Sequence, residues 1–118
     1  MKKIISIALA LLMVAVMLPV MAMAEGTNVV STPDALTAAV TKGGEVTLGD
    51  NITASITIPA GTNVTLNLGG FTLTGNGNHT ITNEGTLTVI GSGKVVNTDG
   101  GKAALFNTVN AVANLNGG

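Results

Sequence analysis

One histidine and one glutamate are the residues that come closest to a reactive pair in this chain. His79 is the only histidine, and Glu84 follows it five residues later. A neutral imidazole beside a carboxylate is suited to general-base catalysis or to metal binding. The two residues flank the Thr-Ile-Thr run at 80–82, however, and no further His, Cys or acidic residue is near. Because a metal site needs three or more ligands, we predict no metal centre and a structural or solvated role for both residues.

Charge and composition narrow the function classes further. The net charge is −1 for the whole chain, and residues 25–118 carry −3, with six acidic residues, three lysines and no arginine. A nucleic-acid-binding surface needs clustered cations, so we predict no nucleic-acid partner. There is no cysteine, and two phenylalanines are the only aromatic side chains besides the histidine. A disulfide-free small domain of this kind must gain stability from regular stacking of small apolar residues. No motif indicates a cofactor.

Residues 1–24 have the pattern of a secretory signal peptide. Two lysines open the chain, residues 4–20 are almost entirely apolar, and Ala22-Met23-Ala24 provides the small-x-small pattern before the cleavage site. We predict cleavage between Ala24 and Glu25, which makes the mature protein secreted or cell-surface located. The alternative is an uncleaved membrane anchor, because the apolar stretch is about long enough to cross a bilayer. In that alternative, the apolar segment is the only part of the chain that we expect to contact the membrane.

Residues 25–44 are expected to form an extended segment and one amphipathic helix. Residues 28–30 are extended, Ser31 or Thr32 is suited to the N-cap, and Pro33 to the first helical position. Gly43-Gly44 supplies the C-terminal stop. The apolar residues of this short helix fall on one face: Leu36, Ala39 and Val40.

From residue 45 to 118 the pattern changes to short alternating runs bounded by Gly, Asn, Asp or Pro, which is typical of strands between turns. These runs are 45–48, 55–58, 63–68, 71–74, 80–82, 86–90, 94–96, 103–106 and 111–115. Alternation directs the apolar residues of 64–89 to one side and their threonine and asparagine neighbours, Thr80 included, to the other. We predict an all-β region.

The runs repeat along the chain, and equivalent positions are roughly 21–26 residues apart. This spacing is typical of solenoid repeats. Residues 65–68 align with 86–89, Leu73 with Val96, Ile81 with Leu105, and 113–115 with 87–89. Three strands per repeat indicate a coil stacked on itself, with each strand parallel to its equivalent in the next coil. The first coil has an apolar end, and we expect the amphipathic helix at 33–42 to cap it.

The stretch TPDALTAAVTKGGEVTLGDNITASITIPAGTNVTLNLGGFTLTG, followed by ITNEGTLTVIGSGKVVNTDGG, resembles a known family. It is similar to the N-terminal part of a right-handed parallel β-helix of the pectate-lyase-like superfamily. More narrowly, it resembles repetitive, adhesin-like surface proteins of anaerobic Gram-positive bacteria. The resemblance covers nearly all of the chain after the signal segment and implies fold more specifically than function.

The resemblance also implies where catalytic residues would lie. Hydrolases with this fold cluster aspartates on one sheet over consecutive coils, and the lyases use an Arg or Lys base with carboxylate-bound calcium. Asp50 and Asp99 have no acidic neighbour one coil away, and the chain has no arginine. No catalytic residue is therefore carried over to this chain, and we predict that it is not an enzyme.

Two polar patterns are candidates for binding sites. The Thr-x-Thr steps at 72–74, 80–82 and 86–88 would suit an ice-binding array only if they shared one face, and we expect them on three different strands. Asn83 and Asn107 fall at equivalent turns of adjacent coils in the repeat. We predict that they form a structural asparagine ladder. No ligand-binding residue is assigned.

The function expected from these features is a non-catalytic, exported structural or adhesive module, with surface polysaccharide or host glycan as candidate ligands. The run at 111–115 begins a further coil without a capping segment, so we expect a fragment of a longer chain, or self-association through this end. The alternative function is the amino-terminal part of a polysaccharide lyase or glycoside hydrolase with catalytic coils downstream.

Overall fold

The computed structural model describes residues 28–118, which form a parallel β-solenoid of about three turns with one short helix. The prediction of parallel coils stacked along one axis is confirmed. The predicted signal segment and its cleavage site between Ala24 and Glu25 lie outside the described residues.

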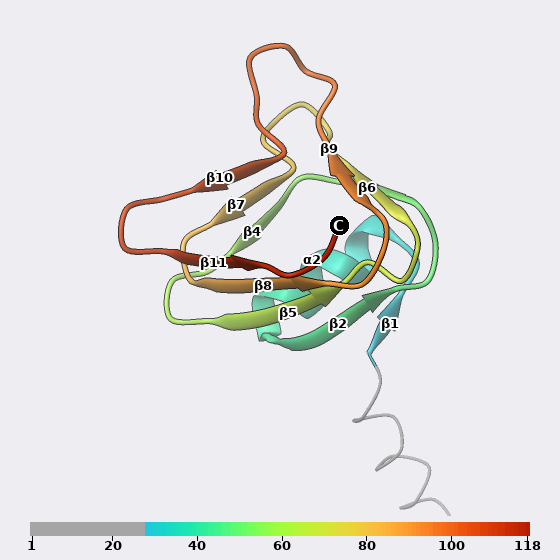
Figure 1. Cartoon of the computed structure of the whole chain (residues 1–118), viewed down its shortest axis with the longest axis horizontal. Coiled ribbons are helices and arrows are strands. Elements are labelled where there is room, and N and C mark those ends of the chain that lie inside the picture. Colours follow the sequence, from blue (N-terminus) through green and yellow to red (C-terminus); the bar gives the residue numbers. More distant parts are fainter. Residues whose placement is uncertain (1–27) are drawn as a thin grey trace, which may run out of the picture.

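Three parallel sheets form the three sides of each coil (Figure 1). Sheet A contains, in order, β1 (Val29–Val30), β2 (Gly44–Leu48), β5 (Asn63–Asn67), β8 (Thr86–Ile90) and β11 (Val112–Leu115). Sheet B contains β3 (Ile52–Thr53), β6 (Thr72–Thr74) and β9 (Lys94–Val96). Sheet C contains β4 (Ile56–Ile58), β7 (Ile81–Asn83) and β10 (Leu105–Asn107). Each coil thus consists of one strand from each sheet.

The core lies inside the coils because each strand alternates a buried apolar residue with a more exposed one. In β5, Val64 and Leu66 are buried while Thr65 and Asn67 are partly exposed. In β8, Leu87 and Val89 repeat this pattern. Parallel pairing places each buried residue above its equivalent, so that Val46, Leu66, Val89 and Leu115 form one continuous column. Adjacent strands in such a sheet are about 4.8 Å apart, which brings the stacked side chains into contact.

The pairing register differs from the sequence prediction at two places. Residues 63–66 of β5, rather than 65–68, pair with 86–89 of β8, so that Leu66 lies beside Val89 and not beside Leu87. In sheet B, Leu73 pairs with Val95 and not with Val96. The predicted pairing of Ile81 with Leu105 and of 113–115 with 87–89 is confirmed.

Helix α2 (Pro33–Lys42) begins and ends where the sequence predicts. Thr32 is the N-cap, and its Oγ1 accepts a hydrogen bond of 3.2 Å from Ala35 N. Gly43 follows the last turn at a φ of 91°, a backbone conformation that side chains other than glycine rarely adopt. Within residues 28–118, no helix has the length and apolar character needed to cross a membrane.

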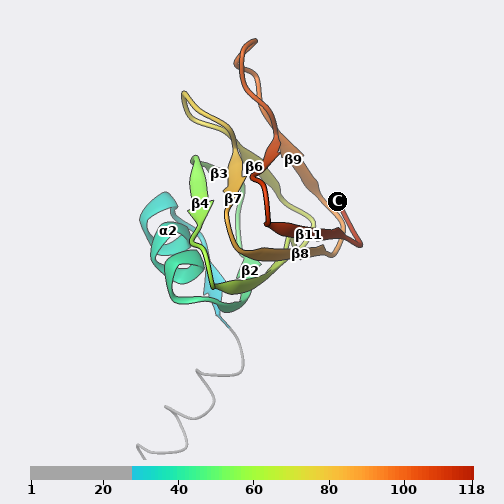
Figure 2. The same cartoon turned by 90° about the vertical axis from the view of Figure 1, so that its left-hand side faces the viewer.

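Helix α2 packs beside the first coil. It contacts β1, β2 and β4, and its buried residues are Leu36, Ala39 and Val40. Figure 2 shows the helix at one end of the stack of coils, with β9 and β11 toward the other. Strand β1 pairs in parallel with β2, so the extended segment before the helix belongs to sheet A.

The prediction that Thr80 lies on the outer side of its strand is wrong. It precedes β7 and is fully buried. Its hydroxyl donates a hydrogen bond of 2.6 Å to Val96 O and accepts one of 3.1 Å from Asn97 Nδ2. The inward turn of Thr80 is possible because these two bonds satisfy the buried hydroxyl.

The connections between sheets B and C lengthen from coil to coil. They consist of residues 54–55 after β3, 75–80 after β6 and 97–104 after β9. The two longer connections project together from one corner of the solenoid (Figure 1). We call residues 75–80 the first corner loop and residues 97–104 the second corner loop.

Candidate functional site

His79 and Glu84 lie at opposite ends of β7 and are not brought together. His79 belongs to the first corner loop, where its Nδ1 accepts a hydrogen bond of 2.9 Å from Ala103 N. Its ring stacks on that of Phe106, with ring centres 4.5 Å apart and planes 6° from parallel. Glu84 is exposed in the turn after β7. The two side chains therefore do not form the acid–base pair that their sequence spacing first suggested.

The exposed aspartates take part in local turns. Asp50 Oδ1 accepts a hydrogen bond of 2.7 Å from Asn51 N, between β2 and β3. Asp99 Oδ1 accepts one of 3.3 Å from Gly101 N in the second corner loop. In the part of the chain that the structure describes, no group of three or more His, Cys, Asp or Glu residues is placed to hold a metal ion.

Asn83 and Asn107 are in direct contact. Asn83 is the last residue of β7 and is fully buried, and its Nδ2 donates to Asn107 Oδ1 at 2.7 Å and to Val112 O at 2.8 Å. Its Oδ1 accepts from Gly85 N at 3.2 Å. Asn107 is exposed, and its Nδ2 donates to Ala111 O at 2.8 Å. These bonds join the ends of β7 and β10 to each other and to the residues that follow each of these strands.

The sequence of residues 80–83 does not indicate that the side chain of Asn83 faces inward. In the register of sheet C, Asn83 lies beside Ile58 of β4 on one side and beside Asn107 of β10 on the other. A buried amide at a position that holds isoleucine one coil earlier has to satisfy its donors and acceptor inside the protein. The turn at 84–85 and the start of β11 provide those partners.

The three Thr-x-Thr steps lie on three different sides of the solenoid. Residues 72–74 form β6 in sheet B, 80–82 overlap β7 in sheet C, and 86–88 lie in β8 of sheet A. In sheet A the partner of residues 86–88 is 63–65, whereas the sequence alignment had placed 65–67 there. The outward column of Glu45, Thr65, Thr88 and Asn114 mixes three residue types. A repeated flat threonine surface is thus not formed by these steps.

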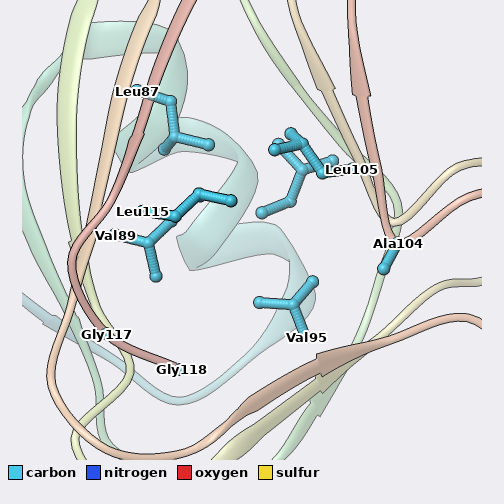
Figure 3. A pocket seen from close by; sticks show the side chains of 9 residues that line it. Leu87, Val89, Val95, Ala104, Leu105, Leu115, Gly117 and Gly118 are labelled. Carbon is cyan, nitrogen blue, oxygen red and sulfur yellow. The ribbon is translucent and has the colours of Figure 1, made fainter.

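The interior of the solenoid opens into an apolar cavity of about 210 Å³ between the last strands. Figure 3 shows side chains from the different sheets directed into it. The residues that line it are Ile81, Leu87, Val89, Val95, Ala104, Leu105, Leu115, Gly117 and Gly118. Its lining contains no ionisable side chain, so the cavity offers shape and apolar contact without groups for acid–base chemistry.

Comparisons of the chain with protein-family models, with curated proteins and with solved structures found no match. The fold described above therefore rests on the geometry of the chain itself.

Proposed function

We propose that this chain is a non-catalytic structural or adhesive module of an exported protein. The observation that supports this proposal is the use of its polar side chains. Three polar side chains with partners in a neighbouring coil are used for hydrogen bonds inside the protein: Asn83, Thr80 and His79. They act as links within the wall of the solenoid.

The proposed fold is a right-handed β-helix of the pectate-lyase-like type, as in surface proteins of anaerobic Gram-positive bacteria. Parallel strands joined by crossover connections are right-handed in nearly all known proteins, which supports this handedness. In this proposal α2 caps the first coil, because Leu36 and Val40 are fully buried against the core beneath it. The exposed apolar residues of β11, Val112 and Leu115, contact a second copy of the chain in this proposal.

The proposed location is outside the cytoplasm, secreted or at the cell surface. The apolar segment at 4–20 and the pattern before Ala24 support export. The proposed ligands are a surface polysaccharide or a host glycan. The outward-facing residues of the sheets include threonines in all three, such as Thr65, Thr74 and Thr82, whose hydroxyl groups are of the kind that hydrogen-bond to sugars.

Expression of the full chain in a bacterial host, followed by mass spectrometry of the exported product, tests the location. We expect a product that begins at Glu25. A product that retains Met1 in the cytoplasm would contradict export, and one that retains it in the membrane fraction would support the anchor alternative.

The exported protein should next be incubated with a panel of polysaccharides, with binding and the release of new reducing or unsaturated ends both measured. We expect retention on at least one polysaccharide without new ends. The matched control is Leu66→Asp, which places a charge in the core and should abolish retention together with the fold. Release of new ends by the folded protein would show that it is an enzyme, and absence of all retention would refute the adhesive role.

A further inference from the structure

Several hydrogen bonds join the two corner loops, and one of them uses the only imidazole of the chain. His79 Nδ1 accepts its hydrogen bond from the backbone N–H of Ala103, which belongs to the next coil. Nearby, Thr80 N donates to Ala103 O at 3.0 Å and Asn97 Nδ2 donates to Asn78 O at 2.7 Å. The second corner loop is thus held against the first by a small number of bonds, one of which involves a titratable atom.

The bond from Ala103 N requires the neutral form of the imidazole. In a neutral imidazole one nitrogen has a free lone pair, and here that nitrogen is Nδ1, so the proton is on Nε2. In the protonated form both nitrogens are donors. An added proton on Nδ1 would point at the N–H of Ala103, and two donors cannot bond to each other.

Stacking on Phe106 does not prevent this protonation, because the face of an aromatic ring attracts a cation. The charged residues of the second corner loop, which packs against His79, are Asp99 and Lys102. Strands β7 and β10 and residues 54–55 carry no charged residue. Asp99 Oδ1 accepts from Gly101 N within its own loop.

We propose that His79 is a pH-sensitive contact that holds the second corner loop against the first when neutral and releases it near Ala103 when protonated. The remaining bonds between the loops keep the sheets paired, and the change is local. The inference does not depend on the proposed adhesive function.

Nuclear magnetic resonance of the ¹⁵N-labelled full chain from pH 4.5 to 8 tests the proposal. The single histidine makes the imidazole signals unambiguous. We expect the amide shift of Ala103 to follow the imidazole titration. Its protection against hydrogen exchange, corrected for the intrinsic pH dependence, should decrease roughly three- to tenfold on protonation, as for the loss of one hydrogen bond. The amide of Thr86, which bonds to Thr62 O away from these loops, should not respond.

Two variants separate titration from structure. His79→Gln retains a side-chain acceptor but cannot titrate, and the pH response of Ala103 should vanish. Phe106→Leu removes the ring stack but retains the imidazole, and the response should persist. An Ala103 amide that stays constant while the imidazole titrates would overturn the proposal, as would an unchanged response in His79→Gln. Unaltered shifts of the amides in sheet A show that each variant remains folded.

Discussion

The two ends of the solenoid contain the same kinds of residue in the same register but differ in burial. In the column of sheet A, the exposed fraction of the residue is 0% for Val46, 0% for Leu66 and 4% for Val89, but 62% for Leu115. Burial in this fold is therefore a property of neighbouring coils, and each coil is stabilised by those on both sides of it.

The first coil achieves full burial by a different route. Its neighbour on the outer side is partly a strand, β1, and partly helix α2, which contacts β2 and β4. Leu36 and Val40 of the helix are fully buried there. These contacts are consistent with the proposed capping role of α2, because burial requires apolar contact and not a particular backbone hydrogen-bond pattern.

The largest expected effect compares two leucines of one column. Leu66→Ala removes a fully buried side chain between two coils, and we expect the free energy of unfolding to fall by about 2–5 kcal/mol. Leu115→Ala removes a mostly exposed side chain, and we expect a loss below about 1 kcal/mol. Urea unfolding followed by circular dichroism measures both. Equal losses would mean that Leu115 is covered in solution, for example by a second copy of the chain.

A smaller difference in stability loss is expected between the two asparagines at the ends of β7 and β10, Asn83 and Asn107. Asn83→Ala leaves Gly85 N and Val112 O without their buried partner, and we expect a loss of about 1–3 kcal/mol. Asn107→Ala should cost about 1 kcal/mol or less, because Asn107 is exposed and water can accept the hydrogen bond that Asn83 Nδ2 donates to its side chain. The same unfolding measurement compares them. A larger loss for Asn107 would indicate that its own amide is covered in solution.

The smallest expected effect concerns the N-cap of helix α2. Thr32→Ala removes the oxygen that accepts from Ala35 N, and the expected loss is about 1 kcal/mol, whereas Thr32→Ser should remain close to the wild type. Thermal unfolding and amide exchange at Ala35 measure the change. If helix α2 stabilises the first coil, exchange at the paired strands β1 and β2 should also become faster in Thr32→Ala.

Much of the fold follows from local signals in the sequence. The helix has a capping threonine, a proline at its start and a glycine after its end, and the structure places the helix at 33–42 as these residues predict. The alternation of apolar and polar residues predicts the strands of sheet A, and repeats of Ile81-Thr-Asn and Leu105-Phe-Asn predict one register of sheet C correctly. Each of these patterns spans only a few consecutive residues, so it can be recognised in the sequence without knowledge of distant partners.

The two wrongly predicted strand registers have a simple physical explanation. A shift by an even number of positions between β5 and β8 keeps every apolar side chain on the inner face, so alternation cannot distinguish the predicted register from the observed one. In sheet B, Val95 and Val96 are both apolar, and either one suits a position beside Leu73. The lengths of the intervening turns decide these registers. The two-residue strand β3 is too short to give a pattern.

The candidate polar sites were less predictable because they depend on partners distant in sequence. Thr80 and Asn83 face inward only because Val96, Asn97 and Val112 supply the matching groups. No pattern within 80–83 contains this information. The stacking of His79 on Phe106 is similarly absent from the sequence, since it joins side chains from two different coils.

The lengthening corner between sheets B and C has a consequence for protein engineering. The connection grows from residues 54–55 to 75–80 and 97–104 while the strands on both sides stay paired in parallel. The entropic cost of closing a flexible loop increases only slowly with its length. The exposed tip around Gly100-Gly101, where an added Cβ meets no neighbouring atom, is therefore a suitable place to insert a foreign peptide for display.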